Sequence, residues 1–133
     1  LILALRQVKA TVDFNQYQGI LRGAIAALEG PQDCVHTTVN TFKTRRDAMV
    51  NALNYHGWVV ASPEATMYLW AKLPERFTDS IDFCVRLVEA TGVALAPGKG
   101  FGKSGEGYVR LALVQPPQVL QQAAQQMVKF ING

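Results

Sequence analysis

The chain has 133 residues, of which 49% are hydrophobic and 17% charged, an ordinary composition for one globular domain with a core. The net charge is only +3 and the basic residues are scattered apart from Arg45 and Arg46, so we expect no nucleic-acid partner. The apolar opening Leu-Ile-Leu-Ala-Leu is far too short to span a membrane, and we expect no membrane partner.

The cysteines and histidines argue against two further kinds of site. Cys34 and Cys84 give neither a disulfide framework nor a metal-ligand spacing, which is typical of a reducing compartment. His36 and His56 are far apart in the sequence and lack a second ligand nearby, so a zinc site has little support. We therefore expect a cytoplasmic protein without a bound metal.

The first 56 residues have the pattern of helices. Residues 1–10 predict the end of one helix, and residues 16–28 predict a second, amphipathic one. Between them lies a polar break in which Asp13 or Asn15 could cap the second helix. Residues 31–55 predict one long helix with an apolar stripe at helical spacing. That stripe consists of Val35, Val39, Phe42, Met49 and Leu53.

After residue 57 the pattern changes to short strands and helices. Residues 58–61 and 67–73 predict two strands around a Ser-Pro-Glu-Ala turn. Tyr68 and Trp70 share one face of the second strand, which favours a place in the core. A helix is predicted over residues 79–91, capped by Asp79 or Ser80 and ended by Gly92. Its expected buried residues are Ile81, Cys84, Val85 and Val88.

The last third of the chain adds two strands and a helix. A short strand is predicted at 93–96, followed by a glycine-rich stretch at 97–107, a strand at 107–114 and a helix that starts at Pro116 and Pro117. The final helix is expected to bury Leu120, Ala124, Met127 and Ile131. The expected fold class is α+β, with a small, mostly antiparallel sheet and helices on one side, preceded by a long helical segment.

Arg110 is the most informative residue of the chain. The alternation along its strand places Val109, Leu111 and Leu113 on one face and Tyr108, Arg110 and Ala112 on the other. A guanidinium is costly to desolvate unless an anion meets it, and its planar fork suits a carboxylate held by two hydrogen bonds. The residues alone leave two partners open, a protein carboxylate in a structural ion pair or the carboxylate of a ligand.

The stretch 100–105, Gly-Phe-Gly-Lys-Ser-Gly, has the letters of a dinucleotide-binding motif in the wrong context. That motif links a strand to a helix whose N-terminus receives the pyrophosphate, whereas a strand is predicted to follow here. We interpret the stretch as a glycine-rich turn that lets the backbone pass close to another segment or to a ligand.

Several segments in register resemble the class I/II aminotransferases, which are pyridoxal-phosphate enzymes of fold type I. Within this family, the segments are most similar in sequence to the aspartate and LL-diaminopimelate aminotransferase-like branch. The segments are Leu-Arg-Gln-Val-Lys-Ala-Thr-Val-Asp (5–13), Ala-Ile-Ala-Ala-Leu (24–28), Arg-Arg-Asp (45–47), Ala-Thr-Met-Tyr-Leu-Trp (65–70), Gly-Val-Ala-Leu-Ala-Pro-Gly-Lys-Gly-Phe-Gly (92–102) and Gly-Glu-Gly-Tyr-Val-Arg-Leu-Ala-Leu (105–113).

The resemblance implies roles for a few residues. Arg110 corresponds to the arginine that binds the α-carboxylate of the amino-acid substrate in this family. Lys99, Gly100 and Phe101 are similar to the family segment near the substrate side chain. A turn that does not line the substrate site is an equally supported interpretation of these residues. Residues 13–16 are similar to a loop that approaches the neighbouring subunit's active site, with helix capping as the alternative.

The family's lysine that binds pyridoxal 5'-phosphate stands in a Ser-Lys-x-x-x-Met/Leu-x-Gly-x-Arg segment. None of the six lysines here, at positions 9, 43, 72, 99, 103 and 129, stands in such a segment. The resemblance therefore implies a piece that begins after that lysine and holds no catalytic or cofactor-binding residue. We expect the full-length parent, a homodimer, to transfer an amino group between an amino acid and a 2-oxo acid, and this piece alone to be inactive.

The resemblance also implies a domain organisation. Residues 1–30 would be the helical tail of the large cofactor-binding domain, 31–56 a connecting helix, and 57–133 the small C-terminal domain. Without the large domain, residues 1–30 are expected to expose apolar surface. Two alternatives remain, another fold type I enzyme such as a decarboxylase or carbon–carbon bond enzyme, and a non-catalytic effector domain of a regulator.

Overall fold

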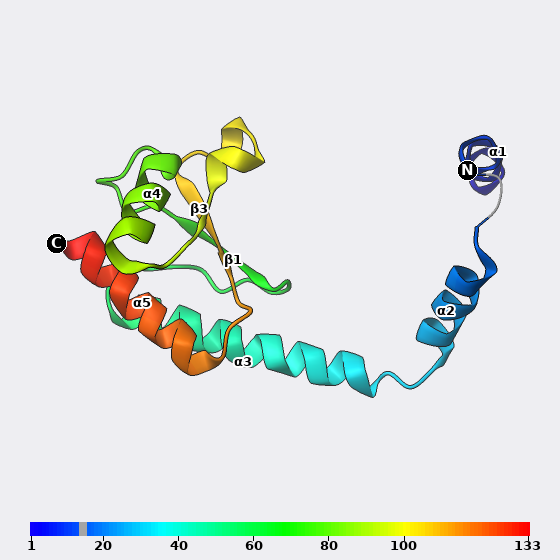
Figure 1. Cartoon of the computed structure of the whole chain (residues 1–133), viewed down its shortest axis with the longest axis horizontal. Helices are drawn as coiled ribbons and strands as arrows, with labels where there is room; N and C mark the ends of the chain where they lie inside the picture. The colour runs from blue at the N-terminus through cyan, green and yellow to red at the C-terminus, as the bar shows by residue number, and fades with distance from the viewer. Residues whose placement is uncertain (14–15) are drawn as a thin grey trace. The chain divides into compact units, whose positions relative to one another are not determined.

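The computed structural model describes residues 1–13 and 16–133 and divides into two compact units, Leu1–His36 and Thr37–Gly133 (Figure 1). Its helices and strands are α1 (Ile2–Val12), α2 (Gln18–Glu29), α3 (Asp33–Tyr55), β1 (Tyr68–Lys72), α4 (Ser80–Thr91), β2 (Ala96–Pro97), the 3-10 turns η1 (Gly98–Phe101) and η2 (Lys103–Gly105), β3 (Tyr108–Ala112) and α5 (Pro117–Asn132). None of the described helices is both long and apolar enough to cross a membrane.

The first unit is helical, and its apolar residues are exposed. No residue of α1 or α2 is buried, and Ile2, Leu5 and Ile20 are each about 60% exposed or more, at 68%, 59% and 62%. This agrees with the expected apolar surface on residues 1–30. Such a surface is costly in water unless another structure covers it.

The prediction that Asp13 caps α2 is wrong. Tyr17 stands at the cap position of α2, and no side chain there accepts a hydrogen bond from the helix. Asp13 instead accepts a hydrogen bond from Lys9 Nζ at 2.6 Å and another from Gln16 Nε2. The i, i+4 ion pair to Lys9 keeps the Asp13 carboxylate at the end of α1, so it does not cap α2. Asn15, the other predicted cap, lies outside the described residues.

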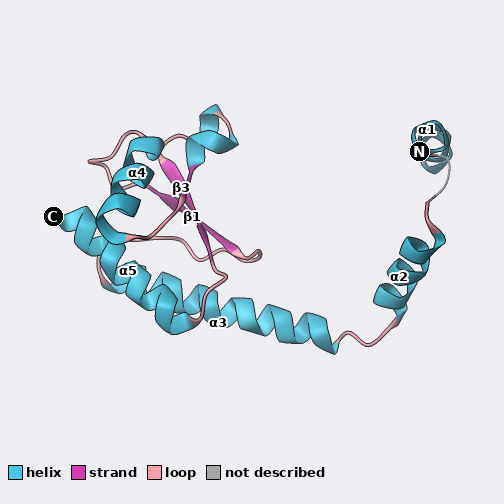
Figure 2. Cartoon of the chain, viewed as in Figure 1, coloured by secondary structure: helices cyan, strands magenta, loops and turns pink. Residues whose placement is uncertain are grey.

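The second unit contains one sheet with strand order β1-β3-β2, and both strand pairs are antiparallel (Figure 2). In the register, Trp70 lies opposite Arg110 on one side, and Ala96 lies opposite Arg110 on the other. Arg110 is therefore in the central strand of the sheet. The predicted fold class, a small antiparallel sheet with helices after a long helical segment, is confirmed.

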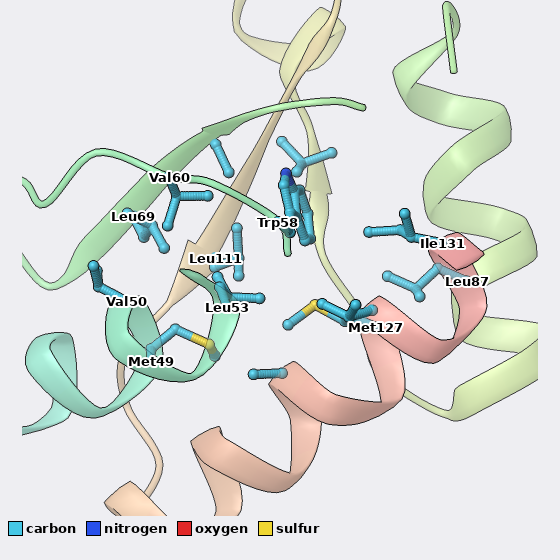
Figure 3. Close-up of a cluster of buried hydrophobic side chains, with 14 of the residues drawn as sticks. Met49, Val50, Leu53, Trp58, Val60, Leu69, Leu87, Leu111, Met127 and Ile131 are labelled. Carbon is cyan, nitrogen blue, oxygen red and sulfur yellow. The ribbon is translucent and has the colours of Figure 1, made fainter. Parts of the chain in front are cut away.

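The core lies against one face of this sheet. Leu69 of β1 and Leu111 of β3 are almost completely buried and pack with Leu53 of α3, Leu87 of α4 and Met127 of α5 (Figure 3). The predicted buried face of α5 is confirmed in full, since Leu120, Ala124, Met127 and Ile131 are all buried. The predicted stripe of α3 is buried only in its last turns, at Met49 and Leu53. Val35 and Val39 stay exposed at 49% and 58%.

Helix α4 turns a different face to the core than its sequence suggested. Asp79 caps it through hydrogen bonds from the Ile81 and Asp82 backbone N–H groups, as one of the two alternatives predicted. Of its predicted buried residues only Cys84 is buried, together with Ser80, Phe83 and Leu87. The predicted Ile81, Val85 and Val88 are 46%, 49% and 40% exposed. The helix carries two overlapping apolar stripes, and the sheet covers the one that holds the larger Phe83 ring.

Residues 58–61 do not form the predicted strand. The side-chain amide of Asn54 takes the place of a strand neighbour, because its Oδ1 accepts from Val60 N at 2.7 Å while its Nδ2 donates to Val60 O at 3.3 Å. Trp58 and Val60 are still buried, and Trp58 Nε1 donates to the carbonyl of Lys72 at 2.9 Å. The apolar run at 58–61 thus contributes buried side chains without pairing in the sheet.

Candidate functional site

Arg110 lies on the sheet face that does not meet the core. Val109 and Leu111, its neighbours in β3, are buried at 0% and 1% exposure, whereas Arg110 itself is half-buried. The predicted alternation of β3 is thus confirmed. Since side chains alternate along a strand, Trp70 of β1 shares the face of Arg110 directly across the antiparallel pair.

The prediction that Tyr68 and Trp70 belong to the core is wrong. Trp70 is 42% exposed and Tyr68 is half-buried, because their strand faces the core with Leu69 and Ala71 instead. Trp70 stacks on Tyr108 with ring centroids 5.7 Å apart and meets the edge of Phe101 at 5.6 Å. These four rings and the Arg110 guanidinium make up one surface, which we call the aromatic face (Tyr68, Trp70, Phe101, Tyr108 and Arg110).

The guanidinium of Arg110 contacts two aromatic rings. Its central carbon lies over the Tyr68 ring, 4.3 Å from the centroid, and over the Phe101 ring at 4.5 Å. Within residues 1–13 and 16–133, the ion pairs closer than 4.0 Å join other residues, so no described carboxylate neutralises Arg110. The structural ion pair that the residues alone left open is not formed in this part of the chain.

The glycine-rich stretch forms two short 3-10 turns, η1 and η2, directly before β3. The backbones of Gly98 and Gly105 pass so close that a Cβ on Gly98 would lie 2.0 Å from the Gly105 carbonyl oxygen. Three amides of the stretch are used inside it, since the N–H groups of Gly102, Gly105 and Glu106 each donate to the carbonyl three residues earlier. This confirms a turn in which backbone passes close to another segment, and it presents Phe101 to Arg110.

The other predicted residues of the stretch lie at the surface. Lys99 and Gly100 are exposed, and Lys99 Nζ lies 3.8 Å from Glu106 Oε2. Glu106 was not predicted as part of the site. Its Oε1 accepts hydrogen bonds from the backbone N–H groups of Ser80, at 2.7 Å, and Gly107, at 3.0 Å. These bonds lower the pKa of the Glu106 carboxyl and hold it on the start of α4.

Ser80 ties the stretch to α4. It is completely buried, and its Oγ accepts a hydrogen bond from Lys99 N at 3.2 Å. Ser80 was one of the two predicted caps of α4, and serine at a helix start is usually explained by capping, so nothing in the sequence indicated this second role. Together, Ser80 and Glu106 anchor both ends of the turn that carries Phe101.

We expect alanine at Gly98 to destabilise the 133-residue chain by about 1–3 kcal/mol, because the added Cβ meets two backbone carbonyls that cannot move independently. Alanine at Gly100 is the matched control. A Cβ there has no atom within 4 Å and the backbone is not in the left-handed region, so a change within about 0.5 kcal/mol is expected. Urea denaturation measures both. Equal losses would contradict the close passage of the two backbones.

Comparison with known proteins gives a consistent picture. Residues 1–127 match the family described as aminotransferase class I and II. The chain is 41% identical to an LL-diaminopimelate aminotransferase of Dehalococcoides mccartyi over 98% of this chain and 33% of that protein. It is 39% identical to the glutamate-pyruvate aminotransferase AlaC of Escherichia coli over 92% of this chain and 30% of that protein.

The solved structures agree with these relatives. The structure of a probable N-succinyldiaminopimelate aminotransferase from Thermus thermophilus superposes with a TM-score of 0.82 at 44% identity, covering 96% of this chain and 34% of that one. The chain therefore belongs to the class I and II aminotransferase family, as the resemblance indicated. It spans about a third of the length of the curated relatives that it matches.

Proposed function

We propose that this chain is the C-terminal part of a pyridoxal-phosphate-dependent aminotransferase, in which Arg110 binds the α-carboxylate of the amino acid or 2-oxo acid. The observation that carries the proposal is the guanidinium of Arg110, which lies in the central strand, half-buried against two rings, without a described protein carboxylate. A cation in that position is stabilised when an anion arrives, and its fork matches a carboxylate in geometry.

The proposal accounts for the position of the residue. β3 is held on both sides by antiparallel neighbours, so the Cα of Arg110 is set by the sheet and not by a loop. A binding residue on a rigid element fixes one end of its ligand more reproducibly than one on a loop. Holding the substrate at its carboxylate orients the bond that reacts, which is the contribution to catalysis that we assign to this chain.

Lys99, Gly100 and Phe101 are proposed to lie beside the substrate side chain. Phe101 supports this most directly because it contacts Arg110 and is 53% exposed. Lys99 is exposed and paired only at 3.8 Å with Glu106, a distance at which a surface ion pair contributes little. Its ammonium is therefore available to a second anionic group on a ligand.

Class I and II aminotransferases use pyridoxal 5'-phosphate, which accepts the amino group and acts as an electron sink. We propose that the described residues of this chain do not form a site for that cofactor. The glycine-rich stretch leads into β3, not into a helix, and the N–H groups of Gly102 and Gly105 donate to carbonyls of the same stretch. No lysine of the chain stands in the family's cofactor-binding segment. We propose that residues outside these 133 hold the cofactor, and we derive no step through it.

The remaining parts of the proposal concern the parent enzyme. Residues 1–30 would end its large domain, 31–56 would connect the domains, and 57–133 would form the small domain of each subunit in a homodimer. The exposed apolar residues of α1 and α2 support this, because the large domain or the second subunit would cover them.

A full-length protein that contains these 133 residues would test the function. We expect it to transfer amino groups from L-amino acids to pyruvate or 2-oxoglutarate, detected by mass spectrometry across a panel of common amino acids. The 133 residues alone should show no turnover. Release of CO2 without amino transfer would point to a decarboxylase instead, and a protein that turns over no amino acid would favour an effector domain.

A further inference from the structure

We propose that Tyr68 and Phe101, which we call the aromatic pair, are positioning residues that order the Arg110 guanidinium before a carboxylate binds. The inference rests on the proposed carboxylate-binding role of Arg110. It adds Tyr68 to that site and gives Phe101 a second role in it. Both rings act here through the guanidinium of Arg110, and for Phe101 this role adds to its proposed place beside the substrate side chain.

The two rings reach Arg110 from different elements. Tyr68 comes from β1, where it pairs with Ala112, two residues from Arg110 along β3, so it lies diagonally across the strand pair. Diagonal neighbours on one face of an antiparallel pair are within reach of aromatic and long side chains. Phe101 comes from η1, and its centroid lies 4.5 Å from the guanidinium carbon, close to the 4.3 Å of Tyr68.

The other two rings of the aromatic face support Phe101. Trp70 meets the edge of Phe101 and stacks on Tyr108, so Phe101 is supported from β1 although it belongs to a 3-10 turn. Below it, the turn is tied to the start of α4 through the Lys99 N–Ser80 Oγ bond. Phe101 is 53% exposed, and its ring still lies against the Arg110 guanidinium.

Aromatic partners suit this task better than an acidic partner would. An arginine side chain has many rotamers, and freezing it when a ligand binds weakens the binding. A carboxylate would order the guanidinium but would also occupy its donors and neutralise its charge. A ring attracts the cation through its face and leaves no competing anion beside it. The carboxylate of Glu106, four residues before Arg110, does not pair with the guanidinium and accepts hydrogen bonds from the N–H groups of Ser80 and Gly107.

The contacts predict different results for conservative and disruptive variants. Tyr68→Phe keeps the ring and should keep Arg110 ordered. Tyr68→Leu and Phe101→Leu remove one ring each and should release the guanidinium. Phe42→Leu is the matched control, since it removes a ring under Arg45, at 5.4 Å, that also packs against the core.

Nuclear magnetic resonance on the 133-residue chain can read the guanidinium directly. In the wild-type chain, protons of Arg110 near the rings should be shifted upfield, and its Nε should show a high heteronuclear NOE. Both signatures should persist in Tyr68→Phe and Phe42→Leu and be lost or reduced in Tyr68→Leu and Phe101→Leu. Titration with propionate, as a simple carboxylate, should give a Kd about three- to tenfold weaker in the two leucine variants of the aromatic pair.

The outcomes separate this inference from the proposed function. Unchanged Arg110 signals and unchanged propionate affinity in Tyr68→Leu and Phe101→Leu would overturn the role of the aromatic pair. Loss of folding stability alone, with normal Arg110 signals, would do the same. Propionate binding that is absent, or that survives Arg110→Ala, would instead overturn the carboxylate site. The ligand-free Arg110 signals still decide whether the rings order the guanidinium.

Discussion

Replacing Arg110 by alanine in the full-length enzyme that we propose should lower kcat/KM for its amino acid by roughly 30- to 1000-fold. The reason is the loss of the bidentate, charge-assisted hydrogen bonds to the carboxylate, which corresponds to about 2–4 kcal/mol. We expect most of the effect in KM, because the carboxylate is held in the bound substrate as well as in the transition state. Binding of pyridoxal 5'-phosphate should be unchanged, which absorbance of the purified variant measures.

Arg110→Lys refines the same test. Lysine keeps the positive charge but offers a compact ammonium in place of the planar fork, and it cannot spread its charge over the Tyr68 and Phe101 rings in the same way. A loss of roughly tenfold in kcat/KM is expected, between the wild type and Arg110→Ala.

Arg86→Ala is a suitable control for these arginine variants. Arg86 is an exposed residue of α4 that pairs with Asp82 at 3.4 Å, so steady-state constants should stay near wild type. A KM that does not respond to Arg110→Ala would rule out the role that we assign to this residue.

Phe83→Ala should destabilise the chain by about 3–5 kcal/mol, the largest expected effect of a single core change. Phe83 is completely buried and makes edge contacts with three other rings, those of Trp58, Phe77 and Phe130. Truncation to alanine leaves a cavity that these rings can only partly fill. Urea denaturation followed by circular dichroism measures the change. If Phe83→Ala does not fold, Phe83→Leu gives a smaller loss of about 1–2 kcal/mol.

Ile81→Ala is the matched control on the same helix. Ile81 is 46% exposed, so its truncation should change the free energy of unfolding by less than about 1 kcal/mol. A larger loss for Ile81→Ala than for the Phe83 variants would show that α4 turns its other face to the core. That is the face which the sequence pattern alone had favoured.

Where the sequence predicted the fold well, the signal came from neighbours in the chain. The alternation of β3, the buried stripe of α5 and the Asp79 cap and Gly92 end of α4 all depend on residues within a few positions of each other. Secondary structure of this kind is set by local geometry, by period two in a strand and by hydrogen bonds of the helix ends.

Where it failed, two local patterns competed or a distant group intervened. Helix α4 carries two apolar stripes, and only its packing against the sheet and α5 selects Phe83 and Leu87 over Ile81. Residues 58–61 form an apolar run that predicted a strand, yet the Asn54 amide bonds Val60 in place of a neighbouring strand. Neither outcome can be read from spacing, because each depends on what lies across the fold.

For the site, the sequence by itself determined that position 110 carries a guanidinium on the face of a strand away from the apolar residues. It also placed the chain in its enzyme family through segments in register. Only the tertiary structure decided which groups surround that guanidinium. Tyr68 and Phe101 are remote from each other in the chain and meet Arg110 because β1 pairs with β3 and the η1 turn is tied to α4. Contacts between distant segments depend on strand register and packing, and a single sequence does not encode these in any local pattern.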